Sequence, residues 1–305
     1  MSAIVVLGSL NMDFVVTVDR LPAPGETTLG RDFQMLPGGK GANQACTAGK
    51  LGAAARMIGR VGYDVFGDHL KASLSAAGVD VSGVHASRAQ PTGVALIWVD
   101  RAGQNSIVVA SGANHAMLPS EVEAMRPSFR GARFALFQLE SPLDVVAAAI
   151  KVARSEGVQT VLDPAPAQPL SPDLLASIDI LTPNEIEASI LLGVPPGRIS
   201  KDEAPQIARR LRECGPRAVV LKLGDQGCFY LDGAFEIFSP GFRVDARDAT
   251  AAGDVFNAAL AVALAEEQTV ADALRFANAA AAISVTRLGA QASVPTRAEV
   301  DAFLG

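Results

Sequence analysis

The sequence predicts an α/β protein with a mostly parallel central sheet, helices on both faces of that sheet, and a small antiparallel β lid. Two observations favour this fold. Short apolar runs alternate with helical patterns along most of the chain, and one hairpin pattern interrupts the alternation. Such alternation is typical of strand–helix–strand crossovers, which produce parallel sheets. The chain has no linker, low-complexity tract or internal repeat, so we expect residues 1–305 to form one domain.

The expected elements follow one another from the N-terminus. A β-branched run at 4–7 ends at a glycine and predicts a buried strand. Two strand-like pieces at 15–18 and 27–33 flank the turn signal "LPAPGE". Small residues then recur at helical spacing over 41–51. The alternating elements that follow are expected as strands at 134–138, 160–162, 178–181 and 218–221 and as helices at 143–156, 185–192 and 204–214.

The hairpin pattern lies in the first half of the chain. Two β-type runs at 94–100 and 105–109 flank the tetrapeptide "RAGQ", which suits a hairpin turn. Together with the strand-like pieces before residue 34, this hairpin predicts the antiparallel lid beside the main sheet. We expect the lid to comprise about 13–36 and 91–110.

Composition and charge exclude several classes of protein. Hydrophobic residues make up 49% of the chain and charged residues 19%, which suits a globular protein with a large core. The net charge of −6 argues against a nucleic-acid-binding surface. The three cysteines are far apart and form no CxxC pair, so neither a disulfide framework nor a zinc site is indicated. No signal peptide or membrane-spanning run is apparent, and we expect a soluble, cytoplasmic protein.

The segment "PGGKGANQA" at 37–45 allows two interpretations. It matches neither the Walker A motif nor GxGxxG. One interpretation is a tight turn into a helix, because glycine permits positive φ. The other is a ligand site, in which backbone N–H groups, Lys40 and Asn43 converge on a hydroxylated molecule. The segment alone favours neither.

Polar residues follow several of the expected strands. Asn11 and Asp13 come after the first strand, Glu140 after the strand at 134–138, and "TPNEIE" after the strand at 178–181. An Asx turn would explain such residues at any one strand. Ligands, however, gather at the carboxyl ends of parallel strands. The repetition favours a polyol site next to a metal-bearing nucleotide site.

The stretch "DATAAGDVFNAAL" at 248–260 places small residues and Asp254 at the start of an apolar helix. The free N–H groups of a helix start attract anions such as a phosphoryl group. An aspartate in the first turn ordinarily only stabilises the helix. Beside an anion site, the same carboxylate could take the proton of an attacking hydroxyl. This combination favours phosphoryl transfer with Mg²⁺.

Taken together, these segments resemble the ribokinase branch of the PfkB sugar-kinase family. The resemblance covers essentially the whole chain, in the order "VLGSLNMDFV", "PGGKGANQA", "TGVALIWVD", "FQLESP", "DPAPA", "LTPNEIE", "DATAAGDVFNAAL" and "RLGAQASVP". The glycine-rich segment and "AAGDVFN" are its most specific motifs. The resemblance implies a ribokinase-like three-layer sandwich and ATP-dependent phosphorylation of D-ribose at O5.

The resemblance also implies roles for individual residues. Asp254 would be the general base, and the N–H groups of Ala251, Ala252 and Gly253 would form the anion hole. The implied sugar-binding residues are Asn11, Met12, Asp13, Gly39, Lys40, Gly41, Asn43, Glu140 and Asp254. The implied ATP-binding residues are Asn184, Glu187, Lys222, Leu223, Gly224, Asp225, Gly227, Gly253 and Asn278. The implied ligands of a K⁺ site are Asp248, Thr250, Ser284, Arg287, Gly289 and Ser293.

Three further points follow from the resemblance. Asn184 and Glu187 match an NxxE motif that organises Mg²⁺, and ribokinases of this kind look like homodimers joined through their β lids. Ala249 stands where the family usually has Thr or Ser, a change that a backbone carbonyl ligand would survive and a hydroxyl contact would not. Lys222 stands where many relatives carry a small hydroxylated residue, and it could pair with a phosphate or point outward.

Two other functions stay open. A deoxyribose, nucleoside or fructose kinase would share the phosphoryl-transfer residues, although Asn11, Asp13 and Asn43 match ribokinases best. A protein of another class, a non-catalytic sugar-binding protein, could also use this fold. The presence of both Gly253 and Asp254 disfavours that second alternative.

Overall fold

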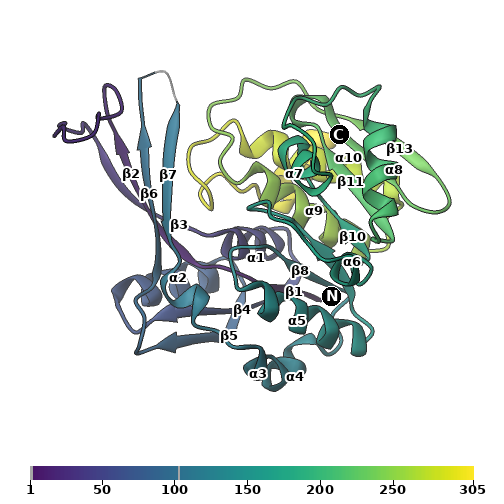
Figure 1. Ribbon diagram of the computed structural model, residues 1–305, viewed down its shortest axis with the longest axis horizontal. Coiled ribbons are helices and arrows are strands. Elements are labelled where there is room, and N and C mark those ends of the chain that lie inside the picture. Colours follow the sequence, from purple (N-terminus) through teal and green to yellow (C-terminus); the bar gives the residue numbers. More distant parts are fainter. Residues whose placement is uncertain (1–2, 102–103) are drawn as a thin grey trace.

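The computed structural model describes residues 3–101 and 104–305, and within these residues the strands form two sheets (Figure 1). The larger sheet has nine described strands in the order β13 (Glu236–Pro240), β12 (Gly227–Leu231), β11 (Ala218–Lys222), β10 (Ile180–Leu181), β9 (Gln159–Leu162), β8 (Phe134–Phe137), β1 (Ala3–Leu7), β4 (Ala54–Gly62) and β5 (Asp80–Ser87). All neighbours from β11 to β5 pair in parallel, and only the pairs β11–β12 and β12–β13 at one edge are antiparallel. The expected mostly parallel sheet is confirmed.

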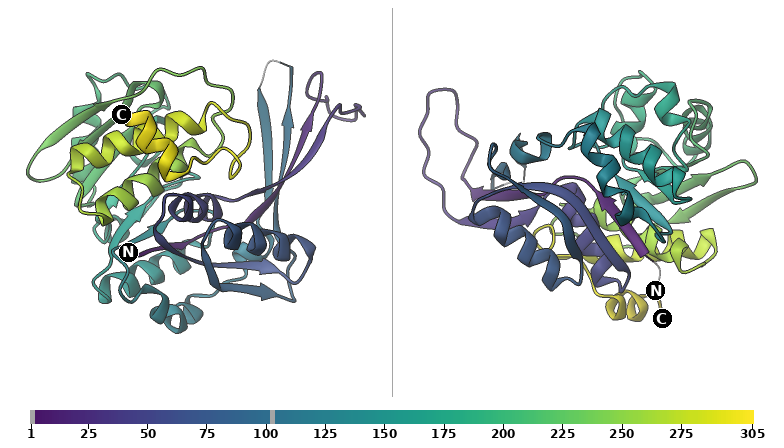
Figure 2. Two further views of the ribbon diagram at one scale, coloured as in Figure 1. Left: turned by 180° about the vertical axis from the view of Figure 1, so that it is seen from behind. Right: turned by 90° about the horizontal axis from the view of Figure 1, so that it is seen from below.

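Helices cover both faces of the main sheet. One face carries α1 (Lys40–Lys50), α2 (Val65–Ala76), α9 (Ala252–Ala265), α10 (Val270–Ser284) and α11 (Arg297–Leu304), seen in front when the molecule is viewed from behind (Figure 2). The other face carries α5 (Leu143–Ser155), α6 (Pro172–Leu175), α7 (Glu185–Leu191) and α8 (Ala204–Glu213), together with the short α3 (Pro119–Val122) and α4 (Arg126–Phe129). Three 3₁₀ turns, η1 (Gly112–His115), η2 (Glu123–Met125) and η3 (Gly224–Gln226), complete the described elements.

Strand β1 shows how the two faces form separate cores. Its side chains alternate between the faces, so Ile4 and Val6 join the core with α1, α2, α9 and α10. Val5 and Leu7 join the opposite core, which contains Ile150 of α5. A strand buried on both faces reads as a continuous apolar run, which is what made this strand recognisable in the sequence. The chain therefore has the expected three-layer arrangement.

The second sheet stands beside the main body (Figure 1) and contains, in order, β3 (Phe33–Gly38), β2 (Asn11–Thr17), β6 (Gly93–Val99) and β7 (Asn105–Ala110). Its outer pairs are antiparallel as expected, but β2 and β6 pair in parallel, so the expectation of a purely antiparallel lid is wrong for the central pair. Strand β2 follows β1 in the chain and β6 follows β5. Because β1 and β5 run in the same direction, β2 and β6 also enter the second sheet in the same direction. The residues at 102 and 103 of the expected "RAGQ" turn lie outside the described residues.

One expected strand is displaced along the chain. The sequence pattern favours a strand at 27–33, whereas β3 begins at Phe33, and only the pairing of Arg31 and Asp32 with Thr17 extends the ladder beyond it. Pro37, the first residue of the glycine-rich segment, lies inside β3 and pairs with Met12. A proline is tolerated there because β3 is an edge strand and needs no donor on its outer side.

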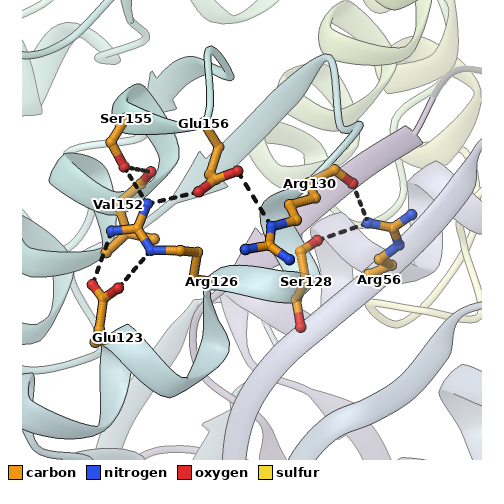
Figure 3. A network of polar contacts seen from close by, with 8 residues as sticks. All are labelled: Arg56, Glu123, Arg126, Ser128, Arg130, Val152, Ser155 and Glu156. Atoms are coloured by element: carbon orange, nitrogen blue, oxygen red, sulfur yellow. Dashed lines mark hydrogen bonds and ion pairs between the residues drawn. The ribbon is translucent and has the colours of Figure 1, made fainter.

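A polar network ties the segment before β8 to the body of the protein (Figure 3). Arg126 bonds Glu123, and it also donates to Ser155 Oγ and Glu156 Oε1, both at 2.7 Å. Arg56 of β4 donates to the carbonyl oxygens of residues 128 and 130 at 2.8 and 3.0 Å. Exposed pairs of this kind contribute little individually, and the network fixes a connection rather than a site. None of the helices in the described part of the chain is long and apolar enough to cross a membrane.

Candidate active site

The buried carboxyl group of Asp254 lies at the centre of the polar residues. Only 5% of this residue is exposed. Its two oxygens accept hydrogen bonds from Asn43 Nδ2 and Gln44 Nε2 of α1, both at 3.0 Å. Burial raises the pKa of Asp254 to about 6, the Lys40 ammonium opposes the rise, and the Asp163 carboxylate adds to it. A base with such a pKa can be ionised at neutral pH and still accept a proton.

The first turn of α9 supports the carboxyl group and is open to close approach. Ala251 precedes the helix in the left-handed region, with φ of 60°, and no side chain caps the helix start. A non-glycine residue adopts this conformation at a cost of roughly 1–2 kcal/mol, which the surrounding structure must compensate. The N–H of Ala252 donates to the carbonyl oxygen of Ala249 at 3.2 Å. A Cβ added to Gly253 would come no nearer than 3.5 Å to Lys222 Nζ.

A second group of carboxylates comprises Glu140, which follows β8, and Asp13 of β2, the strand that comes after β1. Glu140 accepts from Ser9 Oγ at 2.5 Å and from the backbone N–H of Lys40 at 3.2 Å. Burial raises the pKa of Asp13 to about 7, and the carboxylates of Glu140 and Asp254 contribute to the rise. Asn11 is buried, and its Oδ1 accepts from Asn114 Nδ2 at 2.7 Å. The expected meeting of polar side chains from separate strand ends is therefore present.

The glycine-rich segment brings its backbone against these groups. A Cβ at Gly38 would fall 2.1 Å from Asp13 Oδ2, and one at Gly41 would fall 2.6 Å from the backbone of Gly8. Gly39 has φ of 90° and ends the turn that starts α1. The turn interpretation of "PGGKGANQA" is thus correct for the backbone, and Lys40 and Asn43 also face the carboxylates as the ligand interpretation requires.

The Lys40 ammonium is surrounded by negative charge. Burial favours its neutral form, but the carboxylates of Asp254, Asp163, Glu140 and Glu187 outweigh burial and raise the pKa of Lys40. Within the described residues, Asn43 Oδ1 and Gln138 Oε1 are buried and have no hydrogen-bond partner. Buried polar atoms are nearly always bonded. These two oxygens therefore fit a site that receives hydrogen bonds from a polar ligand.

The NxxE motif forms the start of α7. Asn184 and Glu187 make a capping box, in which Glu187 Oε2 accepts from the Asn184 backbone N–H at 2.7 Å and Asn184 Oδ1 accepts from the Glu187 backbone N–H at 2.8 Å. Burial raises the pKa of Glu187, and the Lys222 ammonium opposes this rise. No group of three or more His, Cys, Asp or Glu among the described residues could hold a metal ion by itself. Mg²⁺ usually takes only one or two protein carboxylates together with phosphates, and Glu187 fits such a site.

The remaining residues expected to bind the nucleotide divide into two sets. Lys222 ends β11 and pairs with Asp163. Leu223 and Gly227 flank the η3 turn, and Gly224 and Gly227 have positive φ. Asp225 instead pairs with exposed Arg198 at 2.7 Å. Asn278 is buried on α10 and donates to Ser239 Oγ at 3.0 Å. These last two side chains are engaged outside the cluster around Asp254.

Asp248 joins the two segments expected to bind a monovalent cation. Its carboxylate accepts from the backbone N–H groups of Thr250 at 2.9 Å and Gly289 at 2.8 Å. Burial acts to raise the pKa of Asp248, but these hydrogen bonds outweigh burial and lower it. The other side chains have local partners, which are Ala281 O for Ser284, Glu299 for Arg287 and Ala290 O for Ser293. A cation here would therefore bind mainly backbone carbonyl oxygens.

Sequence reasoning missed several residues that the structure places in the cluster. Gln44 follows Asn43 in the glycine-rich segment, and Asp163 opens "DPAPA" directly after β9. The rule used for the other strand ends would have found Asp163. The same rule would have found Gln138, which directly follows β8, whereas no sequence pattern identifies Asn114 of η1.

Comparisons with known proteins agree with this geometry. The family model described as "pfkB family carbohydrate kinase" matches residues 1–297. The ribokinase of Haemophilus influenzae is 43% identical over 299 residues, which cover 98% of this chain and 97% of that protein. The ribokinase of Bacillus subtilis is 42% identical over 304 residues, which cover 100% of both chains. A solved structure of Arabidopsis thaliana ribokinase complexed with ribose and ATP has a TM-score of 0.90 and 36% identity, covering 100% of this chain and 99% of that one. The chain therefore belongs to the pfkB family of carbohydrate kinases.

Proposed function

We propose that this carbohydrate kinase transfers the γ-phosphoryl group of ATP to O5 of D-ribose, giving D-ribose 5-phosphate and ADP. The observation that carries the proposal is the buried Asp254 carboxylate at the start of α9, fixed by Asn43 and Gln44. The names of the relatives and of the Arabidopsis structure support ribose and ATP as the substrates.

In the proposed reaction, Asp254 acts as the general base. It accepts the O5 proton while O5 forms a bond to the γ-phosphorus and the bond from that phosphorus to the ADP oxygen breaks. The backbone N–H groups of Ala251, Ala252 and Gly253 stabilise the charge on the transferring group. The Ala252 N–H must first leave the carbonyl oxygen of Ala249, to which it donates.

We assign ribose binding to the polar groups around Asp13. The carboxylates of Asp13 and Glu140 accept hydrogen bonds from sugar hydroxyls, and Asn43 Oδ1 is a further acceptor. Met12 is buried in the core, so it contributes only its backbone. The full proposed set is Asn11, Met12, Asp13, Gly39, Lys40, Gly41, Asn43, Glu140 and Asp254.

We assign ATP to the carboxyl ends of β10 and β11 and to η3. The proposed set is Asn184, Glu187, Lys222, Leu223, Gly224, Asp225, Gly227, Gly253 and Asn278. Glu187 and Asn184 would hold Mg²⁺ and its water ligands, and Mg²⁺ supplies charge neutralisation at the phosphates. K⁺ would bind at Asp248, Thr250, Ser284, Arg287, Gly289 and Ser293, mainly through carbonyl oxygens.

We further propose that the chain acts as one domain and that the second sheet, at about 13–36 and 91–110, is its lid. Exposed apolar patches mark interaction surfaces. The described part of this sheet exposes Phe33, Met35, Leu96, Ile107, Val108 and Val109. This surface supports a homodimer joined through the lids. Because the reaction consumes ATP, we also propose a cytoplasmic location.

The proposal is tested by measuring ATP consumption with ribose, deoxyribose, fructose, adenosine and pseudouridine. We expect the highest kcat/KM for ribose and a phosphate on O5 of the product by NMR. A higher kcat/KM for another acceptor would favour a different kinase of the family. Ribose binding without ATP turnover would favour a non-catalytic sugar-binding protein.

A further inference from the structure

A buried ion pair lies between the proposed nucleotide site and the proposed base. Lys222 Nζ is 3.0 Å from Asp163 Oδ1, and the exposed fractions of the two side chains are 12% and 4%. Lys222 ends β11 and Asp163 follows β9, so the lysine reaches across the end of the intervening β10. Removing one partner of a buried pair leaves an uncompensated charge. The Lys222 ammonium therefore leaves Asp163 readily only when another anion takes the place of this carboxylate.

The same ammonium lies beside the first turn of α9. A Cβ added to Gly253 would have Lys222 Nζ as its nearest neighbour, at 3.5 Å. A helix start carries partial positive charge, so the helix repels this ammonium, and the Asp163 carboxylate is the ion-pair partner that holds it there, with Glu187 as a further negative charge. An anion that reaches this point would be attracted by both the ammonium and the helix N–H groups.

Gln44 connects the ion pair to Asp254. Its Nε2 donates to Asp254 Oδ1 at 3.0 Å and to Asp163 Oδ2 at 3.4 Å. Its Oε1 accepts from Gln138 Nε2 at 2.6 Å, which fixes the amide with its amino group toward the two carboxylates. The contacts form an unbroken series from Lys222 through Asp163 and Gln44 to the base. If the charge of Asp163 is less neutralised, Asp163 therefore repels the charge on Asp254 more strongly.

We propose that Asp163 is a positioning residue that holds the Lys222 ammonium at the first turn of α9 until the nucleotide phosphates take it over. The inference rests on the proposed kinase function, because it requires a phosphate at that helix start. When the ammonium moves to the phosphates, Asp163 repels the charge on Asp254 more strongly. The base then binds the hydroxyl proton more tightly when nucleotide is present. The other ionisable groups around this cluster are common to every variant below, and they are Lys40, Asp13, Glu140 and Glu187.

Calorimetry with ATP and with adenosine, in the presence of Mg²⁺ and without ribose, tests the proposal. Lys222→Met should weaken ATP binding about 10- to 100-fold, because it removes a charge-assisted contact to phosphate. Asp163→Asn should have the opposite effect and tighten ATP binding several-fold, because the ammonium loses the carboxylate with which it forms an ion pair. Adenosine binding should not change in either variant. Lys151→Met removes an exposed lysine of α5 and should bind ATP like the wild type.

A merely structural ion pair gives a different result. Both single variants would then change ATP and adenosine binding in parallel and in the same direction, which would overturn the proposal. If Lys222→Met does not fold, Asp163→Asn is compared with the double variant Asp163→Asn/Lys222→Met, which leaves no lone buried charge. The double variant should bind ATP about 10- to 100-fold more weakly, and equal affinities would overturn the proposal. Absence of ribose phosphorylation in the wild type would count against the proposed function alone, because these binding measurements contain no ribose.

Discussion

At the scale of single residues, the environment of each carboxyl group decides its role. Asp254 and Asp13 are both buried and both have raised pKa values, about 6 and about 7. Asp254 is fixed by two amides of α1, whereas Asp13 lies under Gly38 in the second sheet. The first arrangement suits a base that must accept a proton from a fixed direction, and the second suits an acceptor of hydrogen bonds from sugar hydroxyls.

The raised pKa of Asp254 predicts how activity depends on pH. The base must be ionised, so kcat at saturating ribose and ATP should fall as the pH decreases. The midpoint should lie at or above the pKa of about 6 that Asp254 has without ligands, because bound nucleotide raises this pKa. Saturating ribose keeps Asp13 engaged with the sugar, so the profile reports chiefly on Asp254. The measurement is initial rate from pH 5 to 8, with circular dichroism at each pH as the control for folding. A rate that is unchanged down to pH 5 would contradict the assignment.

Glu140 is expected to act on the sugar and not on the nucleotide. It lies at the end of β8 beside Ser9 and the start of α1, while the proposed ATP residues follow β10 and β11. Glu140→Ala should therefore weaken ribose binding by about 10-fold or more, in line with the loss of a charge-assisted hydrogen bond, and change ATP binding little. Calorimetry with each ligand measures both effects. Unchanged ribose affinity would remove Glu140 from the site.

The residues around Asp254 also show which contacts of the site can be predicted from the sequence and which cannot. Asn43 and Asp254 belong to two specific motifs, and the structure brings their side chains to 3.0 Å. Gln44 contacts Asp254 equally closely but could not be distinguished from an ordinary helix residue, because its role depends on the orientation that Gln138 imposes. Contacts between residues that are about a hundred positions apart have no local signal.

At the scale of elements, local pattern predicted β1, β8, β9, β10 and β11 of the main sheet and β2, β6 and β7 of the second sheet, but not β4, β5, β12 or β13. Runs buried on both faces, such as β1, are continuous in the sequence and have clear ends. Strand β3 is largely exposed and contains a proline, so propensity misplaced it by several residues. The parallel pairing of β2 and β6 depends on where β1 and β5 end, which local pattern does not contain.

The loop that leads into α9 is expected to make activity depend on K⁺. Asp248 ties this loop to Gly289 by a 2.8 Å hydrogen bond. A cation bound by the carbonyl oxygens of the two segments would fix Ala251 to Gly253, and fixed N–H donors stabilise developing charge better than mobile ones. K⁺ should therefore raise the initial rate at constant Mg²⁺ and ionic strength, compared with a bulky organic cation. Equal rates in the two salts would show that this chain has no functional cation site.

At the scale of the whole molecule, the second sheet has two faces with different surroundings. Residues at its base, including Asn11 and Asp13, are buried in the proposed sugar site. Farther out, one face of the sheet exposes Phe33, Met35, Leu96 and Val108. An apolar face of this kind is costly in water unless another surface covers it.

We therefore expect Val108→Glu, on the same face as Phe33 and Met35, to convert the proposed dimer to a monomer. The introduced charge would be buried against the apolar surface of the second protomer, which is strongly unfavourable. Light scattering after size-exclusion chromatography measures the mass, and Lys151→Glu, on an exposed position of α5, is the matched control. A wild-type protein that is already monomeric at micromolar concentration would contradict the proposed interface.

The most direct test of the account is the rate of ribose phosphorylation by Asp254→Asn. The substitution preserves the shape of the side chain but removes the proton acceptor, and a positioned general base typically contributes about 10²–10⁴-fold. We predict that kcat falls by about this factor, while calorimetry shows ribose and ATP binding close to wild type. A variant that retains wild-type kcat would contradict the central claim that Asp254 is the base of this kinase.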